Sequence, residues 1–272
     1  MSMALSEFQQ TLCQLIAVNR RASGESYVAG GAALNFVLRG ERISRDIDLF
    51  HDTAEALDAA WQADRRLLES RGYDVQPVRE RAAYVEASVS KAGESVLMEW
   101  TRDSAYRFFP LVEDASLGLA LHPFDLATNK MLALAGRLEV RDWIDLMTSH
   151  DRVQPMGYLA WAACGKDPGF SPLSILEHAA RSGRYTDAEL DGLSFEGRRP
   201  DLAAAARQWR AMLDAAKEIV AALPVEHAGK CVLGADGDLY RGNPGQLADG
   251  LAAGALRFHA GCIRGAYPQI VA

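Results

Sequence analysis

The first half of the chain alternates between two hydrophobic periods, one typical of strands and one typical of helices. Residues 27–50, YVAGGAALNFVLRGERISRDIDLF, predict a strand, a Gly-Gly turn, a short helix and a second strand. Residues 53–71 have apolar positions at helical spacing, and Gly72 marks the predicted end of that helix. Three strands are then predicted at residues 73–80, 82–90 and 95–101. Residues 91–94 predict the hairpin turn that joins the last two.

From His122 onward the pattern becomes helical. Apolar residues recur at helical spacing in 122–140 and 141–151, and again in three later segments, 156–166, 171–183 and 201–223. Asp236-Gly237 lies between two short apolar runs and predicts a hairpin. We therefore predict a mixed α/β (α+β) domain over residues 1–150, followed by a mainly helical C-terminal region over residues 151–272.

The second strand of the opening segment carries two carboxylates, Asp46 and Asp48. Alternate residues of a strand project to the same side, so these two carboxylates lie together while Ile47 and Leu49 face the opposite side and become buried. Two like charges this close require a compensating cation, and hard oxygen ligands suit Mg²⁺ or Mn²⁺. The pattern alone is also compatible with a solvated strand edge.

Composition and charge limit the functional classes. The formal net charge is −7, with 16 basic and 22 acidic side chains in residues 1–150, so a general basic field for nucleic acid is absent from the sequence. No apolar run approaches the roughly 18 to 20 residues that span a bilayer, and no export signal is evident. The four cysteines form no C-x-x-C pair, which favours free thiols. We expect a cytoplasmic protein without a membrane segment.

Gly30-Gly31, directly before a predicted helix, allows backbone N–H groups to approach a phosphate at the positive end of that helix. Followed by S-R-D-I-D-L-F, the pair resembles the signature of the DNA polymerase β-like nucleotidyltransferase superfamily. Gly31 departs from that signature, because many members carry Ser there, which removes a hydroxyl donor and leaves the backbone donors. The resemblance implies a nucleotidyltransferase fold with a small mixed sheet.

Later motifs resemble one branch of that superfamily, the nucleotidyltransferases named for the AbiEii and AbiGii abortive-infection toxins. The resemblance spans roughly residues 25 to 150 and rests on an acidic strand end, a helical D-L-x-x-x-K motif and an R-D-x-x-D-L motif. Here these supply Glu99, Lys130 and Asp142. Glu99 stands where the third carboxylate is usually Asp, and Asp103 is its rival for that role. Locally, Glu99 is equally compatible with a surface strand end.

The resemblance implies a metal-dependent transfer of a nucleoside monophosphate from a nucleoside triphosphate to an acceptor hydroxyl. Asp46, Asp48 and Glu99 are the expected metal ligands and catalytic residues, with Gly30, Gly31, Arg45, Lys130 and Asp142 expected to bind the nucleotide. The acceptor is an RNA end such as tRNA, or a protein hydroxyl, and an antitoxin protein is the expected partner. Two alternatives stay open: a small-molecule nucleotidyltransferase of the antibiotic-modifying type, and a non-catalytic nucleotide-binding or partner-binding module.

Overall fold

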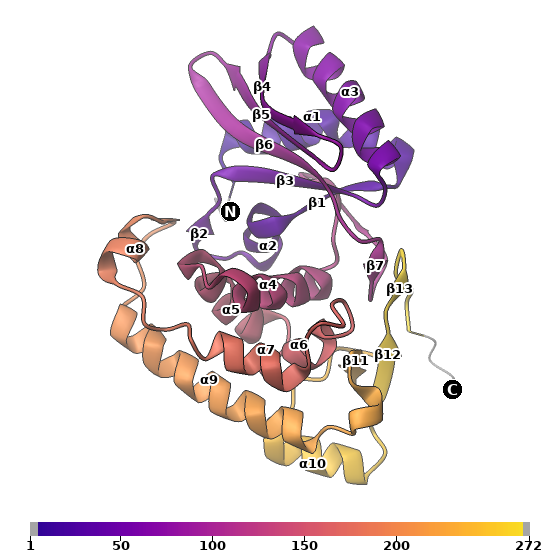
Figure 1. Cartoon of the computed structure of the whole chain (residues 1–272), viewed down its shortest axis with the longest axis vertical. Coiled ribbons are helices and arrows are strands. Elements are labelled where there is room, and N and C mark those ends of the chain that lie inside the picture. Colours follow the sequence, from indigo (N-terminus) through magenta and orange to yellow (C-terminus); the bar gives the residue numbers. More distant parts are fainter. Residues whose placement is uncertain (1–4, 269–272) are drawn as a thin grey trace. The chain divides into compact units, whose positions relative to one another are not determined.

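The computed structural model describes residues 5–268, which divide into two compact units (Figure 1). The first unit holds the chain up to Ala105 together with Pro110–His122. The second unit holds Tyr106–Phe109 together with the chain from Pro123 onward. No helix among residues 5–268 is both long enough and apolar enough to cross a membrane.

A mixed seven-stranded sheet is the centre of the first unit, with strand order β4-β5-β6-β3-β1-β9-β8. Two neighbouring pairs are parallel, β3 with β6 and β1 with β9, and the other pairs are antiparallel. The strands of the sheet are β1 (Ser26–Ala29), β3 (Asp46–His51), β4 (Asp74–Arg81), β5 (Tyr84–Lys91), β6 (Glu94–Arg102), β8 (Val112–Asp114) and β9 (Gly118–Ala120).

Two helices, α1 (Glu7–Ser23) and α3 (Ala54–Ser70), cover one face of this sheet (Figure 1). Trp61 of α3 packs edge-on against Trp100 of β6, with ring centroids 4.8 Å apart. The buried Asp64 carboxylate accepts hydrogen bonds from Trp100 Nε1 at 3.0 Å and Asn19 Nδ2 at 2.8 Å. The buried Asp64 carboxylate therefore has hydrogen-bond partners on both α1 and β6.

The predicted strands and turn of this unit are confirmed. β5 and β6 form a hairpin whose turn residues, Ala92 and Gly93, have φ angles of 53° and 88°. Positive φ at both central residues is the geometry that matches the right-handed twist of paired strands. Helix α2 (Gly30–Leu38) follows β1 without an intervening loop, and β2 (Arg42–Ile43) precedes β3.

The second unit is mostly helical, as predicted. Its apolar core includes Tyr158, Trp161, Ile219 and Val232, all buried. Its elements are β7 (Tyr106–Arg107), α4 (Pro123–Arg137), α5 (Val140–Arg152), α6 (Met156–Ala163), α7 (Pro172–Ala179), α8 (Asp187–Asp191), β10 (Ser194–Phe195), α9 (Leu202–Ala222), a 3₁₀ turn (Val225–His227), β11 (Lys230–Leu233), α10 (Pro244–Ala252), β12 (Arg257–Ala260) and β13 (Cys262–Ile263).

The hairpin predicted at Asp236-Gly237 is confirmed, although it is short. The Gly234 N–H donates to Asp238 O at 2.9 Å, the Tyr240 N–H donates to Val232 O at 3.1 Å, and an antiparallel bridge joins Leu233 and Leu239. The strand partner of β11 is β12, in antiparallel register from Lys230↔Ala260 to Leu233↔Arg257. β11 therefore pairs both with β12, which is distant in sequence, and with the chain just beyond its own turn.

Candidate active site

The turn between β1 and α2 lies directly against the carboxylate of Asp48. Ala29, the last residue of β1, is paired with Asp48 of β3, so Gly30 follows at the point where the chain leaves the sheet. Gly30 has a φ of 63°, and a Cβ built on it would overlap the Asp48 carboxylate and lie 2.8 Å from Asp48 Cβ. Only glycine fits at this position, for both conformational and steric reasons.

Three carboxylates meet on the sheet face that is not covered by α1 and α3. One ligand oxygen from each of Asp46, Asp48 and Glu99 lies within 4.8 Å of the others, and each residue is half-buried. The parallel pairing of β3 with β6 places Asp48 directly beside Glu99. The predicted alternation along β3 is observed, because Ile47 and Leu49 are fully buried on the covered face.

Two further side chains of β5 extend this acidic group, and the sequence did not single them out. Glu86 is paired directly with Glu99, so the row across the strands reads Asp48, Glu99, Glu86. Tyr84 lies on the same face, diagonally across the β5–β6 pairing from Glu99. Burial, Glu99 and Glu86 together raise the pKa of Tyr84 to about 12, so its hydroxyl stays protonated near neutral pH. Alternation along β5 was visible in the sequence, but the pairing that brings these residues to Glu99 was not.

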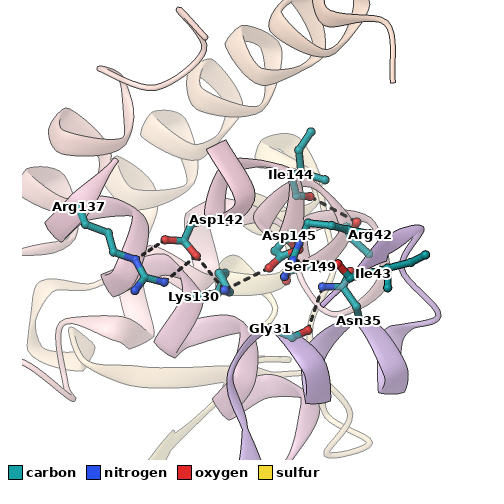
Figure 2. A network of polar contacts seen from close by, with 11 residues as sticks. Gly31, Asn35, Arg42, Ile43, Lys130, Arg137, Asp142, Ile144, Asp145 and Ser149 are labelled. Atoms are coloured by element: carbon teal, nitrogen blue, oxygen red, sulfur yellow. Dashed lines mark hydrogen bonds and ion pairs between the residues drawn. The ribbon is translucent and has the colours of Figure 1, made fainter. Parts of the chain in front are cut away.

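Arg42 is a third residue near the site that the sequence motifs did not single out. It is buried, and a Cβ built on Gly31 would overlap its Nη2 atom and lie 3.4 Å from Ser44 Oγ. The Asn35 side-chain amide donates to the Gly31 carbonyl at 2.9 Å (Figure 2). The glycine at position 31 thus leaves room for a guanidinium and a hydroxyl beside the turn. Arg42 stands four residues before Asp46 in R-I-S-R-D, which was the available signal.

The other possible site residues near β3 differ in their exposure to solvent. Arg45 is exposed and directly precedes β3. His51 is fully buried on the opposite face from the carboxylates, with Nε2 3.0 Å from Ser26 Oγ and Nδ1 3.3 Å from Thr101 O. Burial lowers the pKa of His51 to about 4, despite the hydrogen bond to Thr101. Asp103 follows the end of β6 and is not among the three clustered carboxylates.

In the second unit, Lys130 joins helices α4 and α5 through a buried ion-pair network (Figure 2). Its Nζ lies 2.8 Å from Asp142 Oδ1 and 3.1 Å from Asp145 Oδ2. Arg137 Nε lies 2.6 Å from Asp142 Oδ2. Burial raises the pKa of Asp142, but hydrogen bonds and charge from Arg137 and Lys130 outweigh it, leaving that pKa below its ordinary value.

Asp125, the first residue of the D-L-x-x-x-K motif, has a different role. Its buried carboxylate accepts the backbone N–H groups of Phe108 and Phe109 at 2.9 and 3.0 Å, and Lys166 Nζ lies 2.7 Å away. These contacts tie the start of α4 to the short segment that contains β7. Asp125 therefore acts as a structural carboxylate that holds these parts of the second unit together.

The three-carboxylate group fits divalent cations on chemical grounds. Its ligands are hard oxygens on two adjacent strands, close enough to share an ion, and their mutual repulsion is relieved when a cation binds. The half-buried position strengthens that repulsion relative to fully solvated carboxylates. The cluster is thus a candidate site for Mg²⁺ or Mn²⁺, beside a glycine turn that leads into a helix.

Comparisons with solved structures show that the fold of this chain is similar to that of known proteins. JHP933 from Helicobacter pylori has 13% identity and a TM-score of 0.50, with 81% of this chain and 94% of that chain covered. MenT4, a nucleotidyltransferase toxin from Mycobacterium tuberculosis H37Rv, has 14% identity and a TM-score of 0.50, with 79% and 83% covered. At these identities the likeness concerns the fold. No curated protein sequence matches the chain.

The sequence model of one family, described as "Nucleotidyl transferase AbiEii toxin, Type IV TA system", matches residues 20–222. This stretch covers most of the chain, including the glycine turn, all three clustered carboxylates and the Lys130 network. The chain therefore belongs to the AbiEii nucleotidyltransferase toxin family.

Proposed function

We propose that the protein transfers a nucleoside monophosphate from a nucleoside triphosphate to an acceptor hydroxyl, releasing pyrophosphate. The observation that carries this proposal is the meeting of Asp46, Asp48 and Glu99 within 4.8 Å, beside the Gly30 turn. Phosphoryl transfer depends on charge neutralisation and positioning more than on covalent chemistry, and a cation held by clustered carboxylates next to a glycine turn would serve both needs.

In the first unit, we propose one set of residues that binds the metal ion and another that binds the phosphates. Asp46, Asp48 and Glu99 would hold Mg²⁺ or Mn²⁺, which when bound neutralises phosphate charge and favours the deprotonated acceptor. Glu99 would accept the proton of the attacking hydroxyl. The backbone N–H groups at Gly30 and Gly31 open helix α2, where the helix dipole favours an anion, and Arg45 would add a positive charge.

We also propose that Lys130 and Asp142 help to bind the nucleotide, because both belong to motifs typical of the family. The ammonium group of Lys130 has three protons, and Asp142 and Asp145 accept two of its contacts. Its remaining donor capacity is compatible with a phosphate oxygen. Asp142 would then act through Lys130, by fixing the direction of the ammonium group.

For the acceptor we propose an RNA 3′ end, such as that of tRNA, or a protein hydroxyl, within a toxin–antitoxin pair. Support comes from membership in a toxin family of type IV systems. An antitoxin protein would then be the natural partner. We place the reaction in the cytoplasm, where nucleoside triphosphates are available.

The test uses nucleoside triphosphates labelled at the α-phosphate, with Mg²⁺ or Mn²⁺, total RNA and the purified protein. We expect label on RNA or protein with the wild type, and a loss of about two to four orders of magnitude in Asp48→Asn. Asp58→Asn is the matched control, because it makes the same charge change at an exposed position of α3. It should keep wild-type transfer.

Isothermal titration with a non-hydrolysable triphosphate separates binding from transfer. Metal-dependent binding without any labelled product would favour the non-catalytic module. Equal metal-dependent affinity in wild type and Asp48→Asn would refute the site itself. Label on an added aminoglycoside rather than on RNA or protein would assign the small-molecule reaction.

A further inference from the structure

The edge strand β4 changes the face to which its side chains point partway along its length. Pro77 is paired with Ala87 of β5, whose side chain is buried on the face that α1 and α3 cover. Strict alternation would place Arg79, two residues further on, at the covered face as well. The register instead shifts between Pro77 and Arg79, so that Arg79 is paired with Glu86. One extra residue, Val78, thus moves the rest of β4 into the opposite alternation.

The shift directs two arginines, Arg79 and Arg81, to the face that carries the clustered carboxylates. Arg79 follows Glu99 and Glu86 in the row across the strands, and Arg81 is paired with Tyr84. Because neighbouring strands lie about 4.8 Å apart, the backbone of Arg79 is roughly 10 Å from that of Glu99. Bulges are frequent next to active sites, where they change the direction of a side chain.

The charge on this part of the face is suited to an anionic ligand. Both arginines are exposed, and among residues 5–268 neither takes part in an ion pair. The whole chain has a formal net charge of −7, so two uncompensated arginines near the carboxylate cluster are a local exception. Glu86 lies between Arg79 and Glu99 in the row and repels anions from β5. The anionic groups of a ligand would therefore lie over β4.

Tyr84 adds an aromatic ring to the same face. It is half-buried on β5, between Arg81 of β4 and Thr101 of β6. A basic surface combined with an aromatic side chain is the arrangement by which proteins bind single-stranded nucleic acid, since bases stack on the ring and phosphates contact the cations. A protein acceptor has no regular alternation of anions and planar rings. The observations therefore favour RNA over protein as the molecule that occupies this face.

We propose that the carboxylate-bearing face of β4 and β5 binds the single-stranded 3′ end of an RNA acceptor. Arg79 and Arg81 contact the two phosphates nearest that end, and the terminal base stacks on Tyr84. The terminal hydroxyl then lies over the carboxylates of the neighbouring strands. The inference rests on the proposed function, and it selects RNA as the class of acceptor.

The test measures binding of a short single-stranded RNA, with a free 3′ hydroxyl and a 5′ fluorescent group, by anisotropy at several salt concentrations. Combining Arg79→Gln with Arg81→Gln should weaken binding and reduce the slope of log affinity against log salt by about 1.4, since each phosphate contact contributes about 0.7. Tyr84→Leu should lower the affinity about ten-fold without changing that slope. Arg66→Gln is the matched control, because Arg66 is exposed on α3, which covers the other face of the sheet.

Calorimetric titration with a non-hydrolysable triphosphate separates this inference from the proposed function. Metal-dependent triphosphate binding should be unchanged in the double arginine variant, while transfer of label to RNA falls together with RNA affinity. Wild-type RNA affinity and salt slope in that variant, or label on protein in place of RNA, would overturn the inference and leave the proposed function standing. A wild-type protein without metal-dependent triphosphate binding would refute the proposed function and, with it, the role of this face in acceptor binding.

Discussion

At the scale of single residues, the candidate site depends on one glycine. Gly30 leaves β1 in the left-handed region and presses its backbone against the Asp48 side chain. That contact limits the directions in which the Asp48 carboxylate can turn. It also brings the N-terminal turn of α2 next to the carboxylates, so phosphate and metal positions are set by the same residue.

We predict that Gly30→Ala displaces the Asp48 carboxylate and abolishes metal-dependent triphosphate binding. The matched control is Gly24→Ala, because Gly24 has a φ of 65° and nothing within 4 Å of a built Cβ. The control bears only the left-handed strain of about 1–2 kcal/mol, and Gly30→Ala adds the overlap to it. Thermal unfolding and calorimetric titration measure both effects. Equal losses of stability in the two variants, with binding intact, would contradict this prediction.

Lys130 of α4 forms ion pairs with Asp142 and Asp145 of α5, and these contacts join the two helices. We predict that Lys130→Met lowers the free energy of unfolding by about 3–5 kcal/mol, since the buried carboxylates of Asp142 and Asp145 both lose the ammonium group that lies 2.8 and 3.1 Å from them. Lys217→Met is the control, at a half-exposed position 4.0 Å from Asp214, where a loss of about 1 kcal/mol or less is expected. Denaturant titration compares them. Similar losses would mean that the buried pairs add little.

At the scale of elements, the β5–β6 hairpin carries three of the polar side chains discussed above, Tyr84, Glu86 and Glu99. Val85, Ala87 and Val89 of β5 are buried on the opposite face and fix its register. A slip by one residue would turn the apolar set outward and remove the polar set from the site. The hairpin turn thus affects both stability and the placement of Glu99.

We predict that Ala92→Asn stabilises the protein by about 0.5–1 kcal/mol, because Asn tolerates the observed φ of 53° better than Ala and Asn-Gly is the preferred pair for this turn. For a chain of this size that raises the midpoint of thermal unfolding by about 1–4 °C. The opposite change, Gly93→Ala at a φ of 88°, should destabilise. An unchanged midpoint in both variants would show that the turn does not limit stability.

At the scale of the whole molecule, buried titratable groups couple folding to pH. His51 is the clearest case, because burial lowers its pKa from 6.5 to about 4. Between these values the unfolded chain binds a proton that the folded protein excludes. This contribution is therefore fully present above pH 6.5 and is lost as the pH falls toward 4.

We predict that acidification from pH 7 to pH 4 costs about 3 kcal/mol through His51 alone, at 1.36 kcal/mol per pKa unit. His51→Gln should be less stable at pH 7, where two hydrogen bonds of the ring are perturbed, yet should have a shallower pH dependence between 6.5 and 4. Chemical denaturation of both proteins across that range gives the difference. Parallel pH curves would disprove the assignment to His51.

The sequence by itself determined the local features of this protein. Alternation along 46–51 put Asp46 and Asp48 on one side, and the positions of Gly, Pro and apolar residues gave α3, the β4–β6 strands and the helices from α4 onward. Motif order led to the family, which the match over residues 20–222 confirms. The site roles and the predicted division after residue 150 stay predictions.

Tertiary structure decided which distant residues meet. The parallel pairing of β3 with β6 brings Glu99 beside Asp48, and the register of β5 adds Tyr84 and Glu86. The same holds for the ion pairs of Lys130 with Asp142 and Asp145, and for the pairing of β11 with β12. The physical reason is that hydrophobic periodicity reports which face of an element is buried. The partner and register of each strand depend instead on the packing of the whole unit.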